Sequence, residues 1–138
     1  MKELNPPSMK APPRHFLPII EHCLLVYKLW HEYRNNFPKK SRYTLGDKID
    51  LLFLQTLELL FIASYQPKER KLLTLEMAIK KLDLLKFFLR ISWELEVLDN
   101  KKFIVLSEKL QEIGRMLGGW RKGLETKTPP KKDGGEKQ

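Results

Sequence analysis

The sequence predicts an all-α protein with the up-down-up-down topology of a four-helix bundle, and three features of the sequence lead to this prediction. Apolar residues recur every three or four positions in four segments between residues 18 and 120, as they do in helices that bury one face. Very short turns separate the second, third and fourth segments, so these helices should run antiparallel. No segment shows the alternation that is typical of a β-strand.

The first helix is expected to begin near Pro18, because proline suits the first turn of a helix. It should end around Asn35 and Asn36, before a Phe-Pro pair that disfavours helical backbone. Its apolar residues form one broad stripe that should face the core, made of Ile19, Ile20, Cys23, Leu24, Val26, Tyr27 and Trp30.

The second helix is expected to begin at Thr44, whose hydroxyl suits a helix cap and which stands three residues before the acidic Asp47. It should run to about Tyr65. The runs Leu51–Leu54 and Leu59–Ile62 are apolar throughout, and four consecutive helical residues cover every direction around the helix. This helix is therefore too apolar for a lone bundle, and an oligomer would bury its second face.

The third helix is expected from about Lys68 to Leu98, with Pro67 in its first turn. Its outer face mixes acids and bases at helical spacing, and two interpretations stay open: a solvated face of paired charges, or a binding surface. The inner stripe comprises Leu72, Leu75, Ile79, Leu82, Leu85 and Leu89.

The fourth helix has the most regular repeat, with the steps of three and four residues that are typical of coiled-coil packing. The helix should follow a turn at Asp99–Asn100 and end through Gly118–Gly119 or near Gly123. Glycine in a helix costs about 1 kcal/mol relative to alanine, so close approach of another helix, or a grip on a partner, should compensate. The repeat comprises Phe103, Leu106, Leu110, Ile113, Leu117 and Trp120.

The chain of 138 residues should divide into a bundle over residues 16–123 and two flexible tails, residues 1–15 and the basic residues 124–138. Both tails are rich in proline and charged residues. We expect a cytoplasmic protein, because the single cysteine rules out an intramolecular disulfide and neither a secretory signal nor a membrane span is recognisable.

The sequence offers little support for catalysis, so we expect no enzyme activity, no metal and no cofactor. His22 and His31 are nine positions apart on one helix, too far for the usual shared metal site. There is no Glu-x-x-His motif and no phosphate-binding glycine loop. Cys23 lies on the apolar stripe, where a packed side chain is a simpler interpretation than a nucleophile. A ribonuclease-like toxin is kept as an alternative, although the Arg-x4–6-His spacing of HEPN-like nucleases is missing.

The net charge of +9 is concentrated in both tails and in the segment Lys39–Lys48, a pattern typical of proteins that bind nucleic acid or acidic partners. This segment combines bases with Tyr43, follows Phe37 and leads into a helix N-terminus, which favours a phosphate or carboxylate ligand. A solvated loop whose two aromatic residues pack at its ends explains the same residues equally well.

Two segments resemble the signature stretches of Avd, the accessory variability protein of diversity-generating retroelements. They are Phe37–Ile49, with the sequence FPKKSRYTLGDKI, and Ile113–Trp120, with the sequence IGRMLGGW. Between them, Leu57–Leu60 and Leu84–Arg90 are also similar to that family. The likeness covers about residues 20–122 and leaves out both tails.

The resemblance implies both an assembly and a function. Avd proteins are four-helix bundles that form ring-like homopentamers with a basic surface and have no catalytic role. They bind the reverse transcriptase and the template RNA of the retroelement, and with them the enzyme makes adenine-mutagenised cDNA. Alternatives are the related bundle proteins encoded in intervening sequences of large-subunit ribosomal RNA genes, and a structural oligomer that binds only protein.

Basic residues near helix ends are expected to contact RNA phosphates, cDNA phosphates or acidic side chains, with little sequence specificity. The first choices are Lys39, Lys40, Arg42 and Lys48, followed by Arg115, Arg121 and Lys122. Four further bases should contribute if the ring presents their face, namely Lys80, Lys81, Lys86 and Arg90.

Overall fold

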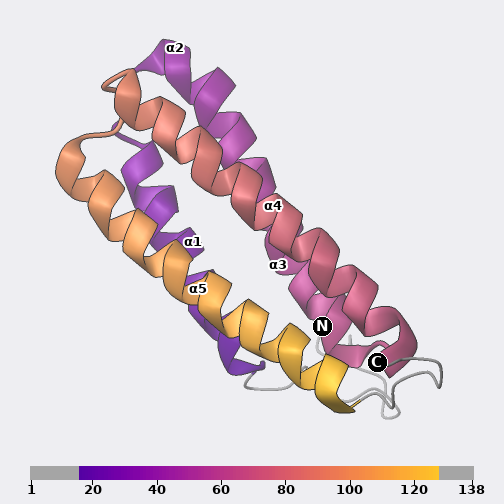
Figure 1. Cartoon of the computed structure of the whole chain (residues 1–138). Coiled ribbons are helices and arrows are strands. Elements are labelled where there is room, and N and C mark those ends of the chain that lie inside the picture. The colour runs from indigo at the N-terminus through magenta and orange to yellow at the C-terminus, as the bar shows by residue number, and fades with distance from the viewer. Residues whose placement is uncertain (1–15, 128–138) are drawn as a thin grey trace, which may run out of the picture.

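The computed structural model describes residues 16–127, which form helices joined by short connections (Figure 1). The long helices are α1 (Pro18–Arg34), α3 (Asp47–Tyr65), α4 (Lys68–Glu94) and α5 (Asn100–Lys127). The short helix α2 (Lys39–Ser41) and the π-helix η2 (Arg42–Gly46) lead directly into α3. This part of the chain contains no strand, so the predicted all-α fold is confirmed. The predicted tail at residues 1–15, and residues 128–138 of the other predicted tail, lie outside the described residues.

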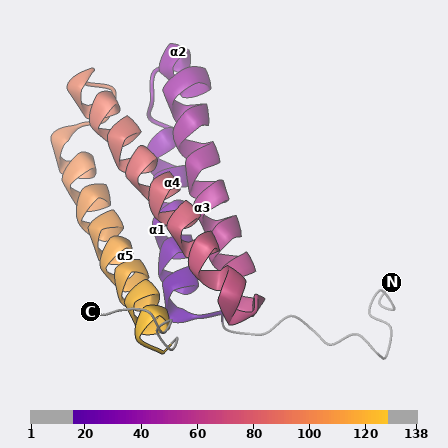
Figure 2. The ribbon, with the colours of Figure 1, turned by 45° about the vertical axis from the view of Figure 1, so that its right-hand side comes forward.

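Each long helix packs against two others. Helices α1 and α4 both contact α3, and both also contact α5. Figures 1 and 2 show the four helices side by side, with the α3–α4 turn at one end of the molecule and the α4–α5 turn at the other, near α2. This arrangement is compatible with the predicted up-down-up-down topology.

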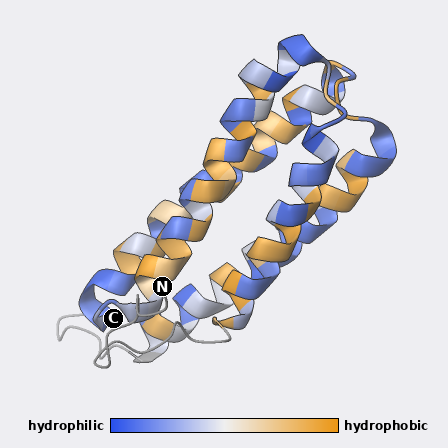
Figure 3. Ribbon diagram, turned by 180° about the vertical axis from the view of Figure 1, so that it is seen from behind, coloured by the Kyte–Doolittle hydropathy of each residue, from blue (hydrophilic) through white to orange (hydrophobic). Residues whose placement is uncertain are grey.

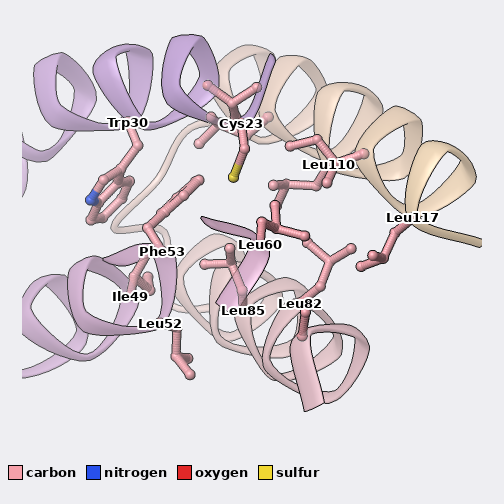
Figure 4. Packing of buried hydrophobic residues seen from close by; sticks show 14 of the residues in the cluster. Cys23, Trp30, Ile49, Leu52, Phe53, Leu60, Leu82, Leu85, Leu110 and Leu117 are labelled. Atoms are coloured by element: carbon pink, nitrogen blue, oxygen red, sulfur yellow. The ribbon is translucent and has the colours of Figure 1, made fainter. Parts of the chain in front are cut away.

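The predicted apolar stripes form the core. Hydrophobic and hydrophilic residues alternate along the helices (Figure 3), and the buried hydrophobic side chains gather between the helices (Figure 4). Near α2 the core is aromatic: the ring centroid of Trp30 lies 5.3 Å from that of Phe37 and 6.1 Å from that of Phe53. Further along, the core is mostly aliphatic, and the central residues of the α5 repeat are all buried, namely Leu106, Leu110, Ile113 and Leu117.

The prediction that Thr44 caps the second long helix is wrong. Residues 39–46 are already helical, so Thr44 lies inside the π-helix rather than at a helix start. Its hydroxyl donates to the carbonyls of Lys40 and Ser41, both at 3.4 Å, as a threonine within a helix does. The helical stretch begins after Pro38, and the basic segment predicted as a loop is an ordered extension of α3.

The ends of the last two long helices also differ from the prediction. Helix α4 ends at Glu94, four residues before Leu98, because Glu96 adopts a left-handed conformation (φ 61°) and stops the helix. Asp99 then caps α5 by accepting a hydrogen bond from the backbone N–H of Lys102 at 2.9 Å. Helix α5 continues through its glycines to Lys127, since none of the described glycines takes the positive φ that ends many helices.

Candidate nucleic-acid interface

A network centred on Arg34 fixes the junction between α1 and α3. Its guanidinium forms an ion pair with Asp47, lies 3.8 Å from a carboxylate oxygen of Asp50, and donates to the carbonyl of Arg42 at 3.3 Å. The indole N–H of Trp30 donates to Asp50 at 3.2 Å. Two residues of α1 thus hold the start of α3 in a defined position.

Arg42 stabilises the same junction from the other side. Its Nη2 donates to the backbone carbonyls of Asn35 at 3.3 Å and Phe37 at 3.1 Å. Carbonyls after the last turn of a helix lack helical partners, and Arg42 supplies donors to this region. The half-buried guanidinium is therefore engaged with the protein itself, and Arg42 positions the segment on which the neighbouring lysines stand.

The lysines of this segment are differently placed. Lys39 and Lys40 are exposed, and within residues 16–127 no carboxylate pairs with either of them. The ammonium of Lys48 lies 5.6 Å from the ring centroid of Phe88 on α4, in a cation–π contact. The nearby carboxylate of Asp47 is paired with Arg34. We call the exposed residues Lys39, Lys40, Tyr43 and Lys48 the α2–η2 surface; it carries positive charge on an ordered helical stretch.

A second basic region lies along the groove between α4 and α5. Two adjoining hollows of about 370 Å³ and 400 Å³ share Asp83, Lys86 and Gln111 in their walls. Arg90 lines the first hollow, and Arg115 and Arg121 line the second. The structure therefore brings four of the predicted binding residues to one groove.

The charges of this groove are largely balanced within their own helices. Arg90 pairs with Glu94 at 2.8 Å and Arg121 with Glu125 at 3.7 Å, and Arg115 forms an ion pair with Glu112. Exposed pairs of this kind leave little net field for a phosphate. Lys80, Lys81 and Lys122 line neither hollow, so the predicted residues do not form one continuous patch.

Comparison with known families decides the affiliation of the chain. A family model described as bAvd-like matches residues 21–124. The chain belongs to this family. No curated protein matches the sequence. The match spans most of α1 through most of α5 and contains both segments that resemble Avd, Phe37–Ile49 and Ile113–Trp120.

Membership in the bAvd-like family gives the chain a broad role. It is an accessory protein of diversity-generating retroelements and associates with components of such elements in general. The family is one of accessory proteins rather than of catalysts.

Burial raises the pKa of the Cys23 thiol to about 12, which keeps this buried group protonated and unreactive. Within residues 16–127 no three His, Cys, Asp or Glu side chains are grouped as metal ligands, and no helix has the length and hydropathy to cross a membrane.

The glycines of the second Avd-like segment fall into two classes. A Cβ on Gly114 would lie 3.6 Å from Leu82 and 3.5 Å from Lys86, so this glycine faces α4 at ordinary contact distance. Within residues 16–127, a Cβ on Gly118 or Gly119 would meet no atom within 4 Å. Packing among the described residues therefore does not explain these two glycines, which leave a low, open strip on α5.

The side of α3 away from the core is apolar and partly exposed, and Phe61 there packs edge-on against Phe16 at 6.2 Å. Leu51, Leu54 and Phe61 are 45–48% exposed, although they lie on a helix whose opposite face is fully buried. Leu73 and Met77 of the adjacent helix α4 are also exposed. We call these five residues the outer α3–α4 face; it agrees with the prediction that the second long helix is too apolar for a lone bundle.

Sequence reasoning missed the position of Tyr43. Packing at the end of a loop was one expectation, but the residue is 62% exposed. Phe37, the other aromatic residue of this stretch, is buried against Trp30 as a loop-end residue would be. Tyr43 lies on the π-helix η2, whereas Phe37 precedes the helical stretch, and the apolar and capping patterns did not predict a π turn there.

Proposed function

We propose that the chain is the non-catalytic accessory protein of a diversity-generating retroelement, which binds the reverse transcriptase and its template RNA in the cytoplasm and so enables mutagenic cDNA synthesis. The single observation that carries the RNA-binding part is the pair Lys39 and Lys40: both are exposed, neither has an acidic partner within the described residues, and the segment beneath them is fixed by Arg34 and Arg42.

RNA phosphates are the ligands that this surface suits best. Two unpaired ammonium groups on an ordered helix can bind phosphate oxygens without first breaking internal ion pairs. The arginines of the α4–α5 groove would have to leave Glu94, Glu112 and Glu125. We therefore rank the α2–η2 surface first for RNA and for cDNA, and the groove, with Lys80, Lys81 and Lys122, second.

The same proposal includes a homo-oligomeric assembly of up-down-up-down bundles, with the homopentamer of Avd as its expected form. The outer α3–α4 face supports it, because burying a leucine side chain contributes roughly 1.5–3 kcal/mol. In a ring, one copy would supply only part of a larger basic surface for RNA and enzyme.

RNA binding is the decisive test. We would measure the affinity of the purified chain for the element's template RNA by fluorescence anisotropy, for the wild type and for the Lys39→Glu/Lys40→Glu double variant. The variant should lose most of the binding, and the wild-type affinity should fall steeply with salt because counterions are released. Lys28→Glu/Lys109→Glu, two exposed bases of α1 and α5 without an acidic partner in residues 16–127, provides the same change of charge elsewhere.

One competing function has an observation in its favour. The paired charges of the groove and the apolar outer α3–α4 face also suit a structural oligomer that binds only protein. In that case Lys39→Glu/Lys40→Glu and Lys28→Glu/Lys109→Glu would both bind RNA as weakly as the wild type. The only interaction detected would be co-purification with the reverse transcriptase. A preparation of the wild type that binds the enzyme but retains no RNA at low salt would favour this second function.

A further inference from the structure

We propose that Tyr43 is a base-stacking residue that makes the α2–η2 surface selective for single-stranded over duplex RNA. The inference rests on the proposed RNA-binding function and adds the class of RNA and the residue that selects it. Three observations about Tyr43 support it: its lack of partners, its place among the lysines and the π turn beneath it.

Tyr43 has no structural task within the described part of the chain. Of the four tyrosines, Tyr27 packs on Phe53 at 5.6 Å, Tyr33 lies under the ammonium of Lys102 at 5.3 Å, and Tyr65 packs on Phe61 at 5.2 Å. The side chain of Tyr43 makes no hydrogen bond or ring contact within residues 16–127, and the residue is 62% exposed. Its ring is free to stack on a ligand.

The lysines stand at the positions from which they can hold a strand across that ring. Lys39 precedes Tyr43 by four residues and Lys40 by three, the spacings that place side chains on one side of a helix. A π turn adds one residue to a helical turn and shifts the faces that follow by one position. In a regular α-helix, residues seven apart lie on the same side. With one π turn between them the interval becomes eight, so Lys40 and Lys48 come to one side of the helix.

Selectivity follows from what each form of RNA offers. A single strand exposes the faces of its bases, and stacking on an aromatic side chain tolerates any sequence. In a duplex the base faces are covered by their neighbours, so only the phosphates remain for the lysines. Tyr43 should thus contribute to binding of single strands and leave duplex binding unchanged.

The test uses the full chain and three labelled probes: a single-stranded 12-nucleotide RNA of mixed sequence, the same phosphate backbone with abasic sites, and the corresponding duplex. Tyr43→Ala should weaken binding of the single strand on the order of 5- to 100-fold, the range of base–aromatic stacking. It should not change binding of the abasic strand or the duplex. Tyr43→Phe keeps the ring and should bind the single strand like the wild type.

Other outcomes separate the two proposals. If Lys39→Glu/Lys40→Glu abolishes RNA binding but Tyr43→Ala binds the single strand like the wild type, stacking is refuted and the basic surface stands. Equal losses on the strand and the duplex would also refute it. A wild type that binds none of the probes would overturn the RNA-binding function itself. Tyr65→Ala, at the far end of α3, serves as the matched control and should retain full affinity, and circular dichroism checks that each variant is folded.

Discussion

The guanidinium of Arg34 forms an ion pair with Asp47 and so connects the last turn of α1 to the first turn of α3. Arg34 is mostly buried, lies 3.8 Å from Asp50 and donates to the carbonyl of Arg42, so several groups depend on one side chain. The lysines proposed to bind RNA stand on the short segment between the two helices that this residue joins.

Arg34→Met should therefore destabilise the fold by about 1–3 kcal/mol, the cost of leaving partly buried polar groups without a partner. Urea denaturation followed by circular dichroism gives the free energy of unfolding. Arg115→Met removes the exposed ion pair with Glu112 and should change it by less than about 1 kcal/mol. Equal effects of the two substitutions would show that the Arg34 network does not stabilise the junction.

Glu96→Gly should stabilise the protein. Glu96 has a φ of 61°. The backbone N–H of Glu96 donates to the carbonyl of Trp93, and the N–H of Val97 donates to the carbonyl of Ser92. This is the hydrogen-bond pattern of a Schellman helix end. A side chain in the left-handed region costs about 1 kcal/mol, which glycine avoids. Thermal denaturation should show a higher Tm for this variant. Glu108→Gly, in the interior of α5, should lower the Tm instead; a lower Tm for both would contradict the assignment.

Much of the fold could be predicted because the spacing of apolar residues in the sequence directly indicates which face of each helix is buried. Pro18, Tyr65 and Lys68 lie at the predicted helix bounds, and the repeat from Leu106 to Leu117 is buried as expected. The errors fall where local patterns compete with tertiary contacts. Thr44 had the pattern of a cap, but helical structure had already begun after Pro38.

The candidate site was less predictable because exposure and pairing depend on three-dimensional neighbours. Arg42 and Lys39 are both bases of one short segment, yet one binds backbone carbonyls and the other lacks a partner in the described part of the chain. For Arg90 the sequence left open a face of paired charges or a binding surface, and acids at i,i+3 or i,i+4 are also present for Arg115 and Arg121. Which of these spacings become ion pairs depends on the three-dimensional arrangement of the side chains.

Cys23 should resist thiol reagents in the folded protein. Burial raises the pKa of its thiol from 9.0 to about 12, so at pH 8 the reactive thiolate is suppressed and the sulfur is covered. Labelling with a maleimide should proceed only after denaturation. Because the folded pKa is above the unfolded one, this thiol also makes stability fall as the pH rises from about 9 towards 12, and Cys23→Ala should remove that part of the loss. Rapid labelling of the native protein at pH 8 would contradict its burial.

Substitution of a glycine in α5 should affect the stability of the chain and its assembly with a partner in opposite directions. The Cβ added by Gly118→Ala meets no atom of the described residues within 4 Å, and the backbone there is ordinary helix, so the substitution should stabilise the isolated chain by about 1 kcal/mol in urea denaturation. Gly46→Ala should lack this gain, since its Cβ would lie 3.2 Å from Nε of the fixed Arg34 side chain. If a partner approaches the open strip, Gly118→Ala should also weaken co-purification of the reverse transcriptase. Unchanged co-purification would show that the strip is not used by that enzyme.

The outer α3–α4 face should determine the oligomeric state. Light scattering of the wild type should give a mass near five times the 16.4 kDa of one chain. Leu54→Glu/Leu73→Glu places two charges on exposed positions of this face. The variant should have a mass near that of one chain and retain its helical content, because a buried, unpaired carboxylate is strongly unfavourable at an interface. Leu25→Glu changes an exposed leucine on α1 and should leave the mass unchanged. A wild type that is monomeric at all concentrations would refute the ring and leave the apolar surface to another partner, of which the reverse transcriptase is the first to test.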